Sequence, residues 1–224
     1  IGPLASKPVM EGKGLLFKIF ADIDVFDIEI DTKNIDEFIE TVKNISPTFG
    51  GINLEDIKAP EAFEIERRLV DELDIPVMHD DQHGTAIISG AALINALELA
   101  NKKIGEIQMV ICGAGAAAIS CAKMYKSLGV KKKNMLMFDS KGLININRKD
   151  LSLEKKLFAS KNVEIQSLAD AINGSDVFIG LSKADMMSKE MLLSMNKNPI
   201  VFAMANPDPE ISYKVAVKTR DDII

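Results

Sequence analysis

The sequence contains no Trp, and aromatic residues make up only 5% of its 224 residues. A surface that stacks nucleic-acid bases needs aromatic side chains, so this shortage argues against nucleic-acid binding. The formal net charge of −6 argues the same way, because phosphate backbones are repelled by negative surfaces. No apolar run reaches the ~18 residues of a membrane span, and no secretory signal is visible. We therefore expect a cytoplasmic globular protein without nucleic-acid or membrane partners.

Cysteine is also scarce, since Cys112 and Cys121 are the only two and form no CxxC motif. We expect both to be reduced thiols in the cytosol. The chain starts at Ile1 rather than Met, and residues 221–224 resemble an unfinished strand. These ends favour a fragment of a longer polypeptide.

The first third of the chain mixes helices and strands. Residues 26–30 alternate apolar and acidic side chains, which is typical of a half-buried strand. A cap at Asn34 and apolar residues at helical spacing predict a helix up to Val42. Short strands are expected at 52–54 and 76–78, with a helix from Pro60 between them.

From Thr85 the pattern changes to a long Ala-rich helix and then to alternating strands and helices. Strands are expected at 108–112, 135–138, 177–179 and 200–204, and helices at 115–128, 167–172 and 188–195. Apolar strands separated by helices predict a parallel sheet covered on both faces. The expected fold is α/β, with a doubly wound, Rossmann-type dinucleotide domain at 84–224 that is incomplete at its C-terminal end. Part of a smaller α/β domain for substrate and metal is expected at 1–83.

The clearest motif is a G-x-G-x-x-A loop that directly follows an expected strand and opens a helix. Its residues are Gly113, Ala114, Gly115, Ala116, Ala117 and Ala118. Gly113 permits the tight turn, Gly115 lets a pyrophosphate approach the backbone, and Ala118 allows close helix packing. The free N–H groups of the helix start would bind the phosphates. A glycine-rich turn without a ligand is the less favoured interpretation.

Asp139 ends the next expected strand, where an acidic residue usually accepts bonds from the adenine ribose of NAD. Ser140 and Lys141 follow directly, and they could instead hold the 2′-phosphate of NADP. The sequence therefore leaves the choice between NAD and NADP open.

Two acidic pairs, Glu55–Asp56 and Asp80–Asp81, stand at the ends of expected short strands. Adjacent carboxylates repel each other, so two pairs brought together would favour a cation. Oxygen ligands suit Mg²⁺ or Mn²⁺, and the two histidines that flank the second pair suit such ions less well. Taken alone, such a pair is more often a solvated turn or a helix cap, and spacing does not bring the two pairs together.

Lys13 lies between Gly12 and Gly14, at an expected boundary before the helix-like residues 15–18. A lysine that is buried near a cation can act as a base. Taken alone, an exposed lysine without a catalytic role is the more common case.

Together these motifs resemble the malic enzymes, and most of all the bacterial type whose catalytic part is often fused to a phosphotransacetylase-like domain. The resemblance rests on residues 5–13, 49–57, 79–86, the Gly113 loop and 202–207. It implies oxidative decarboxylation of malate to pyruvate and CO₂, with reduction of NAD or NADP, and a homo-oligomer.

The resemblance also assigns roles to residues. It places the metal ligands at Glu55, Asp56 and Asp81. It places the general base at Lys13, with Asp80 as its charge partner. Asn206 falls at a position that contacts the substrate beside the cofactor.

Three family features have no counterpart in the chain: a general-acid tyrosine, an arginine upstream of the lysine and a second substrate asparagine. Of the two tyrosines, Tyr125 is expected in the core and Tyr213 matches no acid position.

One alternative function is that of a dehydrogenase of amino acids or hydroxy acids that does not decarboxylate. Another, for this stretch of chain alone, is a catalytically inert nucleotide-binding module.

Overall fold

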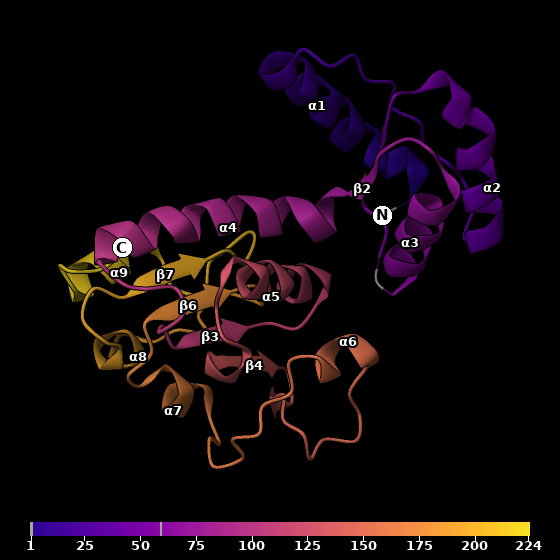
Figure 1. The fold of residues 1–224 in the computed structure, drawn as a ribbon. Helices are drawn as coiled ribbons and strands as arrows, with labels where there is room; N and C mark the ends of the chain where they lie inside the picture. Colours follow the sequence, from indigo (N-terminus) through magenta and orange to yellow (C-terminus); the bar gives the residue numbers. More distant parts are fainter. Residues whose placement is uncertain (1, 59) are drawn as a thin grey trace. The chain divides into compact units, whose positions relative to one another are not determined.

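A computed structural model describes residues 2–58 and 60–224. The chain divides into two compact units, Ile1–Asp81 and Gln82–Ile224 (Figure 1). This division lies two residues before the boundary between residues 83 and 84 that the sequence predicts. Each unit has its own core.

The first unit places three helices around a two-stranded sheet. Its elements are α1 (Pro3–Ala21), α2 (Ile35–Ile45), the 3₁₀ turn η1 (Ser46–Thr48), β1 (Ile52–Leu54), α3 (Glu61–Glu72) and β2 (Val77–His79). β1 and β2 are parallel, with Leu54 opposite His79. The core is formed by Ile39, Val42, Leu54, Ile65 and Leu69. The predicted helix after Asn34 and both predicted short strands are confirmed.

The start of α2 follows the expected capping chemistry. The side-chain oxygen of Asn34 accepts hydrogen bonds from the backbone N–H groups of Asp36 and Glu37, at 2.9 and 3.2 Å. The Glu37 carboxylate accepts from the Thr32 hydroxyl at 2.7 Å, so Thr32 takes the place of the Asn34 N–H in the reciprocal half of the cap.

The predicted strand at residues 26–30 is wrong, because residues 22–34 form no helix or strand. Within the described residues, β1 and β2 pair with each other, and neither pairs with this segment. Its acidic side chains contact α1 instead: Asp27 forms an ion pair with Lys7, and Glu29 lies 3.6 Å from the same Lys7 Nζ. Phe26 remains 72% exposed.

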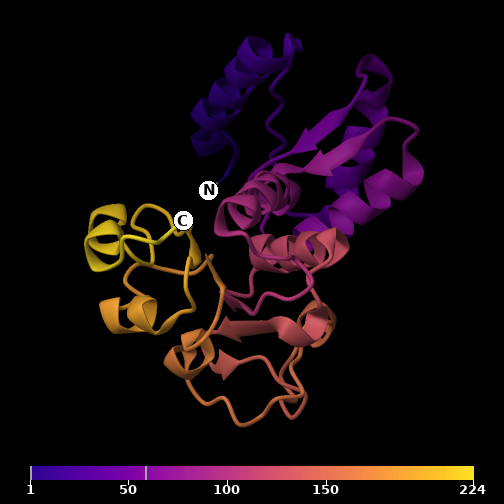
Figure 2. The ribbon, with the colours of Figure 1, turned by 60° about the vertical axis from the view of Figure 1, so that its left-hand side comes forward.

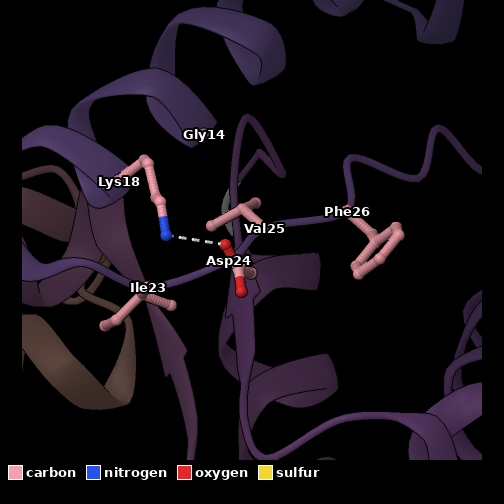
Figure 3. Close-up of a pocket in the computed structure, with 6 residues that line it drawn as sticks. All are labelled: Gly14, Lys18, Ile23, Asp24, Val25 and Phe26. Atoms are coloured by element: carbon pink, nitrogen blue, oxygen red, sulfur yellow. Dashed lines mark hydrogen bonds and ion pairs between the residues drawn. The ribbon is translucent and has the colours of Figure 1, made fainter.

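The element boundary expected near Lys13 is also wrong, because α1 runs through it without a break. Gly14 lies against Val25 of the extended segment, and a Cβ there would meet Val25 at 3.5 Å. Figure 3 shows the pocket of about 410 Å³ at this place, where Lys18 Nζ lies 2.9 Å from Asp24 Oδ1. Gly12 and Gly14 thus lie inside α1 despite the low helix propensity of glycine.

The second unit is built on a five-stranded sheet in the order β5-β4-β3-β6-β7. The strands are β3 (Met109–Cys112), β4 (Met135–Asp139), β5 (Gly142–Leu143), β6 (Val177–Gly180) and β7 (Ile200–Ala203), and the helices are α4 (Asp80–Ala100), α5 (Ala116–Leu128), α6 (Leu153–Lys156), α7 (Leu168–Ile172), α8 (Lys189–Ser194) and α9 (Tyr213–Thr219), with the 3₁₀ turn η2 (Lys132–Asn134). All neighbouring strands are parallel except the edge pair β4 and β5. That antiparallel edge strand was not predicted. α4 begins five residues before the predicted start at Thr85, so its first two residues belong to the first unit.

Successive residues of β3 point to opposite faces of the sheet and pack on different helices. Met109 and Ile111 belong to a core with α4 and α5, whereas Val110 and Cys112 belong to a core with α7, α8 and α9. Helices therefore cover both faces (Figure 1 and Figure 2). The predicted doubly wound α/β fold is confirmed. No helix in the described part of the chain has the length and apolar character that crossing a bilayer requires.

Candidate functional site

Three carboxylates converge at the ends of the small sheet in the first unit. Glu55, Asp80 and Asp81 each offer one oxygen, and these oxygens lie within 4.8 Å of one another. Glu55 follows β1, and the two aspartates follow β2 in the first turn of α4. Parallel strands end at the same edge of a sheet, so the pairing of β1 with β2 brings the two distant stretches together.

Asp56, which the resemblance makes a metal ligand, does not contribute its carboxylate to this group. It is exposed, and its backbone has a positive φ of 55°. Its N–H donates to Asp81 Oδ2 at 3.1 Å. Asp56 therefore orients Asp81 in this arrangement, and Asp80 supplies the third oxygen.

Lys13 reaches the carboxylates from α1. Its Nζ lies 2.6 Å from Asp80 Oδ2 and 3.2 Å from Glu55 Oε2. Burial lowers the pKa of Lys13, but the hydrogen bonds to Asp80 and Glu55 raise it more, so the pKa lies above its usual value. In this arrangement Lys13 is an ammonium group.

The Glu55 carboxyl group is the most enclosed member of the group, with 7% of its side chain exposed. Burial raises its pKa, and hydrogen bonds from Lys13 and from Asn53 oppose the shift without cancelling it. One ammonium faces three carboxylates, so the group retains an excess of negative charge. An arrangement of this kind favours a further cation.

A pocket of about 1030 Å³ lies within the first unit and includes Lys13, Glu55 and Asp56 in its wall. Much of the remaining wall is apolar, with Phe17 and Phe38 among its side chains. The pocket has the size and the mixture of apolar surface and few charged groups that are typical of small-molecule sites.

The glycine-rich loop of the second unit has the geometry that its motif predicts. Gly113 has a φ of 130°, and a Cβ there would lie 2.3 Å from the carbonyl oxygen of Leu181, so only glycine fits. Gly115 is the N-cap of α5, has no side-chain cap, and a Cβ there would meet no atom within 4 Å. Ala118 is 1% exposed and packs in the core. The helix start is thus open for an anion, as a pyrophosphate requires.

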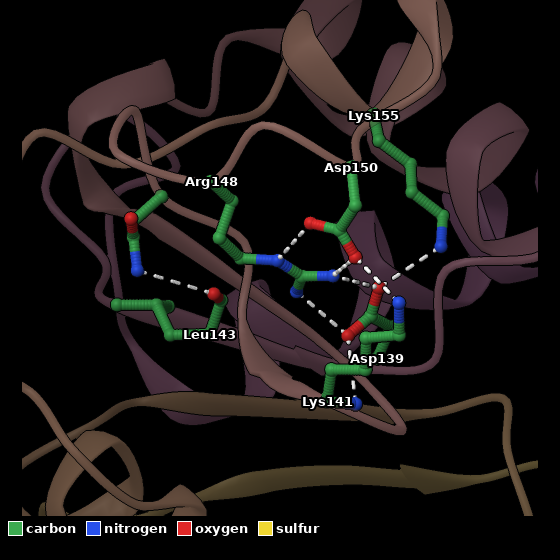
Figure 4. Close-up of polar contacts among 7 residues, drawn as sticks. Asp139, Lys141, Leu143, Arg148, Asp150 and Lys155 are labelled. Atoms are coloured by element: carbon green, nitrogen blue, oxygen red, sulfur yellow. Dashed lines mark hydrogen bonds and ion pairs between the residues drawn. The ribbon is translucent and has the colours of Figure 1, made fainter.

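Asp139 ends β4, but both of its carboxylate oxygens already accept hydrogen bonds (Figure 4). Arg148 donates to Oδ1 and Oδ2 at 2.7 and 3.0 Å, and Lys155 donates to Oδ2 at 2.9 Å. Burial alone would raise the pKa of Asp139, but these cations outweigh it and lower the pKa to about 2. Sequence reasoning missed both partners, because they lie beyond a turn and an unpredicted strand.

The same cluster contains Lys141 and Asp150, whose charged groups lie 2.8 Å apart. Arg148 also donates to Asp150 at 3.1 and 3.0 Å. Three cations therefore face two carboxylates, which leaves one positive charge beside the exposed Ser140. The cluster is nearly neutral, in contrast to the acidic group of the first unit.

Asn206 follows β7 and is exposed. It lies at the carboxyl edge of the sheet, as does the Gly113 loop, where ligands of such sheets bind. Sequence reasoning missed its neighbour Glu210, which is 0% exposed and accepts the Ala205 N–H at 3.1 Å. Tyr125 is 0% exposed, as predicted for a core residue.

Two family models match the chain. The malic enzyme NAD-binding domain matches residues 82–218, and the malic enzyme N-terminal domain matches residues 32–70.

Among curated proteins, the NADP-dependent malic enzyme of Halomonas elongata is 53% identical over 224 residues, which are 100% of this chain and 53% of that protein. The NAD-dependent malic enzyme of Rhizobium meliloti is 53% identical over 222 residues, which are 99% of this chain and 29% of that protein. The chain thus spans about half of the first relative and less than a third of the second.

Among solved structures, the NAD-dependent malic enzyme of Thermotoga maritima matches with a TM-score of 0.91 and 43% identity, over 98% of this chain and 59% of that one. The malic enzyme of Pyrococcus horikoshii matches with a TM-score of 0.88 and 42% identity, over 98% of this chain and 53% of that one.

Proposed function

Because the chain belongs to the malic enzyme family, we propose that the protein containing it converts malate to pyruvate and CO₂ while it reduces NAD or NADP. The observation that carries this proposal is the group of Glu55, Asp80 and Asp81 oxygens within 4.8 Å, with Lys13 Nζ 2.6 Å from Asp80. This arrangement joins a candidate cation site to a candidate base.

The carboxylate group fits Mg²⁺ or Mn²⁺, because it consists of oxygen ligands and has more negative charge than Lys13 balances. Glu55 and Asp81 would hold the ion. Two residues are candidates for the third ligand. The position of its oxygen in the group favours Asp80, whereas the family resemblance favours Asp56. A bound ion supplies Lewis-acid chemistry, which stabilises the negative charge that develops on the substrate as CO₂ departs.

Lys13 would accept the proton of the C2 hydroxyl as the hydride leaves C2. This role requires a neutral amine, whereas the contacts with Asp80 and Glu55 raise its pKa. Lys13 would lose its proton more readily once the charge of Glu55 is neutralised by a cation. Asp80 would then keep the amine oriented toward the substrate.

The loop from Gly113 to Ala118 would bind the pyrophosphate of the dinucleotide, and its open helix start supports this role. Asp139, Ser140 and Lys141 would lie by the adenine ribose. Relatives named for NAD and for NADP are equally similar to the chain, and we keep both cofactors in the proposal. Asn206 would contact malate beside the nicotinamide.

The test is a spectrophotometric assay of the full-length protein with malate, Mn²⁺ and each dinucleotide in turn. We expect formation of NADH or NADPH, together with pyruvate and CO₂ in equal amounts, and no reaction after the divalent ion is removed. Reduction of the dinucleotide without CO₂ would instead identify a dehydrogenase that does not decarboxylate. The acidic group argues against that second function, which has no need of such a group.

We also propose a homo-oligomer in the reducing cytoplasm. The sequence left residues 15–23 as either core or interface, and most of their large apolar side chains are exposed, among them Leu15 at 61% and Phe20 at 83%. The free thiols of Cys112 and Cys121 support the reducing location. Light scattering of the full-length protein measures the oligomeric state directly, and a monomer would contradict the proposal.

A further inference from the structure

One buried acid in the second unit is explained neither by the fold nor by the proposed chemistry. Glu210 is 0% exposed, and it forms no ion pair within residues 2–58 and 60–224. An isolated carboxylate is costly to bury, so its retention requires compensating hydrogen bonds. Those bonds come from the backbone of two loops.

The two carboxylate oxygens of Glu210 bind different loops. Oε1 accepts the N–H of Ser182, which follows β6, at 2.9 Å. Oε2 accepts the N–H of Ala205, which follows β7, at 3.1 Å. One side chain thus joins the loops at the carboxyl ends of two adjacent strands.

The space for this carboxylate is provided by Gly180, the last residue of β6. A Cβ at Gly180 would lie 2.3 Å from both Cδ and Oε2 of Glu210. Any larger residue at position 180 would therefore displace the carboxylate. The position of the Glu210 carboxylate therefore depends on the absence of a side chain at Gly180.

Each loop that Glu210 holds leads to a residue of the candidate ligand site. Leu181 precedes Ser182; its N–H donates to the Cys112 carbonyl at 2.8 Å, and its own carbonyl faces Gly113 of the dinucleotide loop. Ala205 directly precedes Asn206. A shift of Glu210 would therefore move Asn206 relative to the dinucleotide loop.

From this geometry we propose that Glu210 is a positioning residue, which holds Asn206 in register with the Gly113 loop so that malate and the nicotinamide meet correctly. The inference rests on the proposed function. It adds a residue that touches neither malate nor the dinucleotide and acts through the backbone of Ala205 and Ser182.

The test compares Glu210→Gln with Asp176→Asn in the full-length protein. Glutamine keeps one acceptor but presents an amide NH₂ to the second N–H, so one of the two loops is released. Asp176 is the matched control, because it also accepts a backbone N–H, from Gln108 at 2.8 Å, but at the opposite edge of the sheet. Its side chain is 15% exposed and pairs with Lys102.

We expect Glu210→Gln to raise the KM for malate about tenfold at saturating dinucleotide, as is common when a substrate contact is misplaced. Asp176→Asn should lower the melting temperature and leave the malate KM within twofold. A purely structural role of Glu210 would reduce the fraction of active protein, which lowers kcat and leaves KM unchanged. An unchanged KM in a folded Glu210→Gln protein would overturn the inference.

Gly180→Ala provides a second, independent variant, because its methyl group displaces the same carboxylate. We expect the same rise in malate KM. If neither variant folds while Asp176→Asn does, Glu210 serves stability rather than positioning, and the inference is overturned as well. If the wild-type protein forms no pyruvate, the proposed function itself fails, which is a separate outcome.

Discussion

The two charged clusters of the chain differ in how far their positive and negative charges balance. In the first unit, Lys13 lies against Glu55 and Asp80, and its single positive charge leaves the group of Glu55, Asp80 and Asp81 with an excess of negative charge. In the second unit, Asp139 is held by Arg148 and Lys155, and the cluster is nearly neutral. The acidic excess marks the first cluster as a candidate cation site, whereas the ion pairs of the second hold Asp139 in place beside the proposed ribose position.

The largest effect is expected at Asp81. Asp81→Asn in the full-length protein removes a negative ligand oxygen, so Mn²⁺-dependent pyruvate formation should fall to background while the dinucleotide still binds. The measurements are the pyruvate assay, dinucleotide fluorescence titration and Mn²⁺ binding by electron paramagnetic resonance. Asp71→Asn is the control, because Asp71 is 64% exposed and pairs with the equally exposed Arg67. Turnover at the wild-type rate would remove Asp81 from the metal site.

The same assay with Asp56→Asn and Asp80→Asn identifies the third ligand. The geometry predicts that Asp80→Asn raises the Mn²⁺ concentration for half-activation more than Asp56→Asn, because the Asp56 carboxylate lies outside the group. The opposite order would favour the ligand set that the family resemblance implies.

The next largest effect on turnover is expected for Lys13→Ala. Loss of a general base typically costs about 10²–10⁴-fold, and we expect a fall of this size in kcat with little change in dinucleotide affinity. Small primary amines should restore part of the rate. Lys7→Ala is the control, since Lys7 is on the same helix and forms its ion pairs with Asp27 and Glu29 of the extended segment. A near-normal rate in Lys13→Ala would refute the role.

A smaller effect is expected in the balanced cluster. Arg148→Ala leaves Asp139 without its bidentate partner, and the side chains of both residues are mostly buried. We expect the free energy of unfolding to fall by about 1–3 kcal/mol in urea titrations. Arg67→Ala, whose side chain is 65% exposed, should change it by less than about 0.5 kcal/mol. Equal effects of the two substitutions would contradict the structural role of the cluster.

The smallest effect is expected for the contribution of Asp139 to the pH dependence of the unfolding free energy. Its folded pKa of about 2 lies below the unfolded value of about 3.9, so the carboxylate stabilises the fold above pH ~4. This contribution is lost as the pH falls toward 2. The difference in unfolding free energy between wild type and Asp139→Asn should therefore shrink by about 1–2 kcal/mol between pH 5 and 2.5. A difference independent of pH would show that the carboxylate is not stabilised as an anion.

Much of the second unit follows from local patterns. Strands β3, β4, β6 and β7 are continuous apolar runs, and their alternation with helices predicts the parallel sheet. The edge strand β5 consists of two residues, which is too short for any pattern to predict. The alternation at 26–30 misled because periodicity shows which residues differ in polarity, but not whether a partner strand exists.

The doubly wound fold and the dinucleotide loop can be predicted from the order of residues, because both depend on residues that are close along the chain. The tertiary structure alone decided that Asp80 joins Glu55 and Asp81, and that Glu210 connects two loops. The decisive contacts join residues far apart in the sequence: Glu55 lies well before Asp80 and Asp81, and Glu210 is 28 residues from Ser182. They depend on the register of β1 with β2 and on packing around the sheets, and no local pattern carries that information.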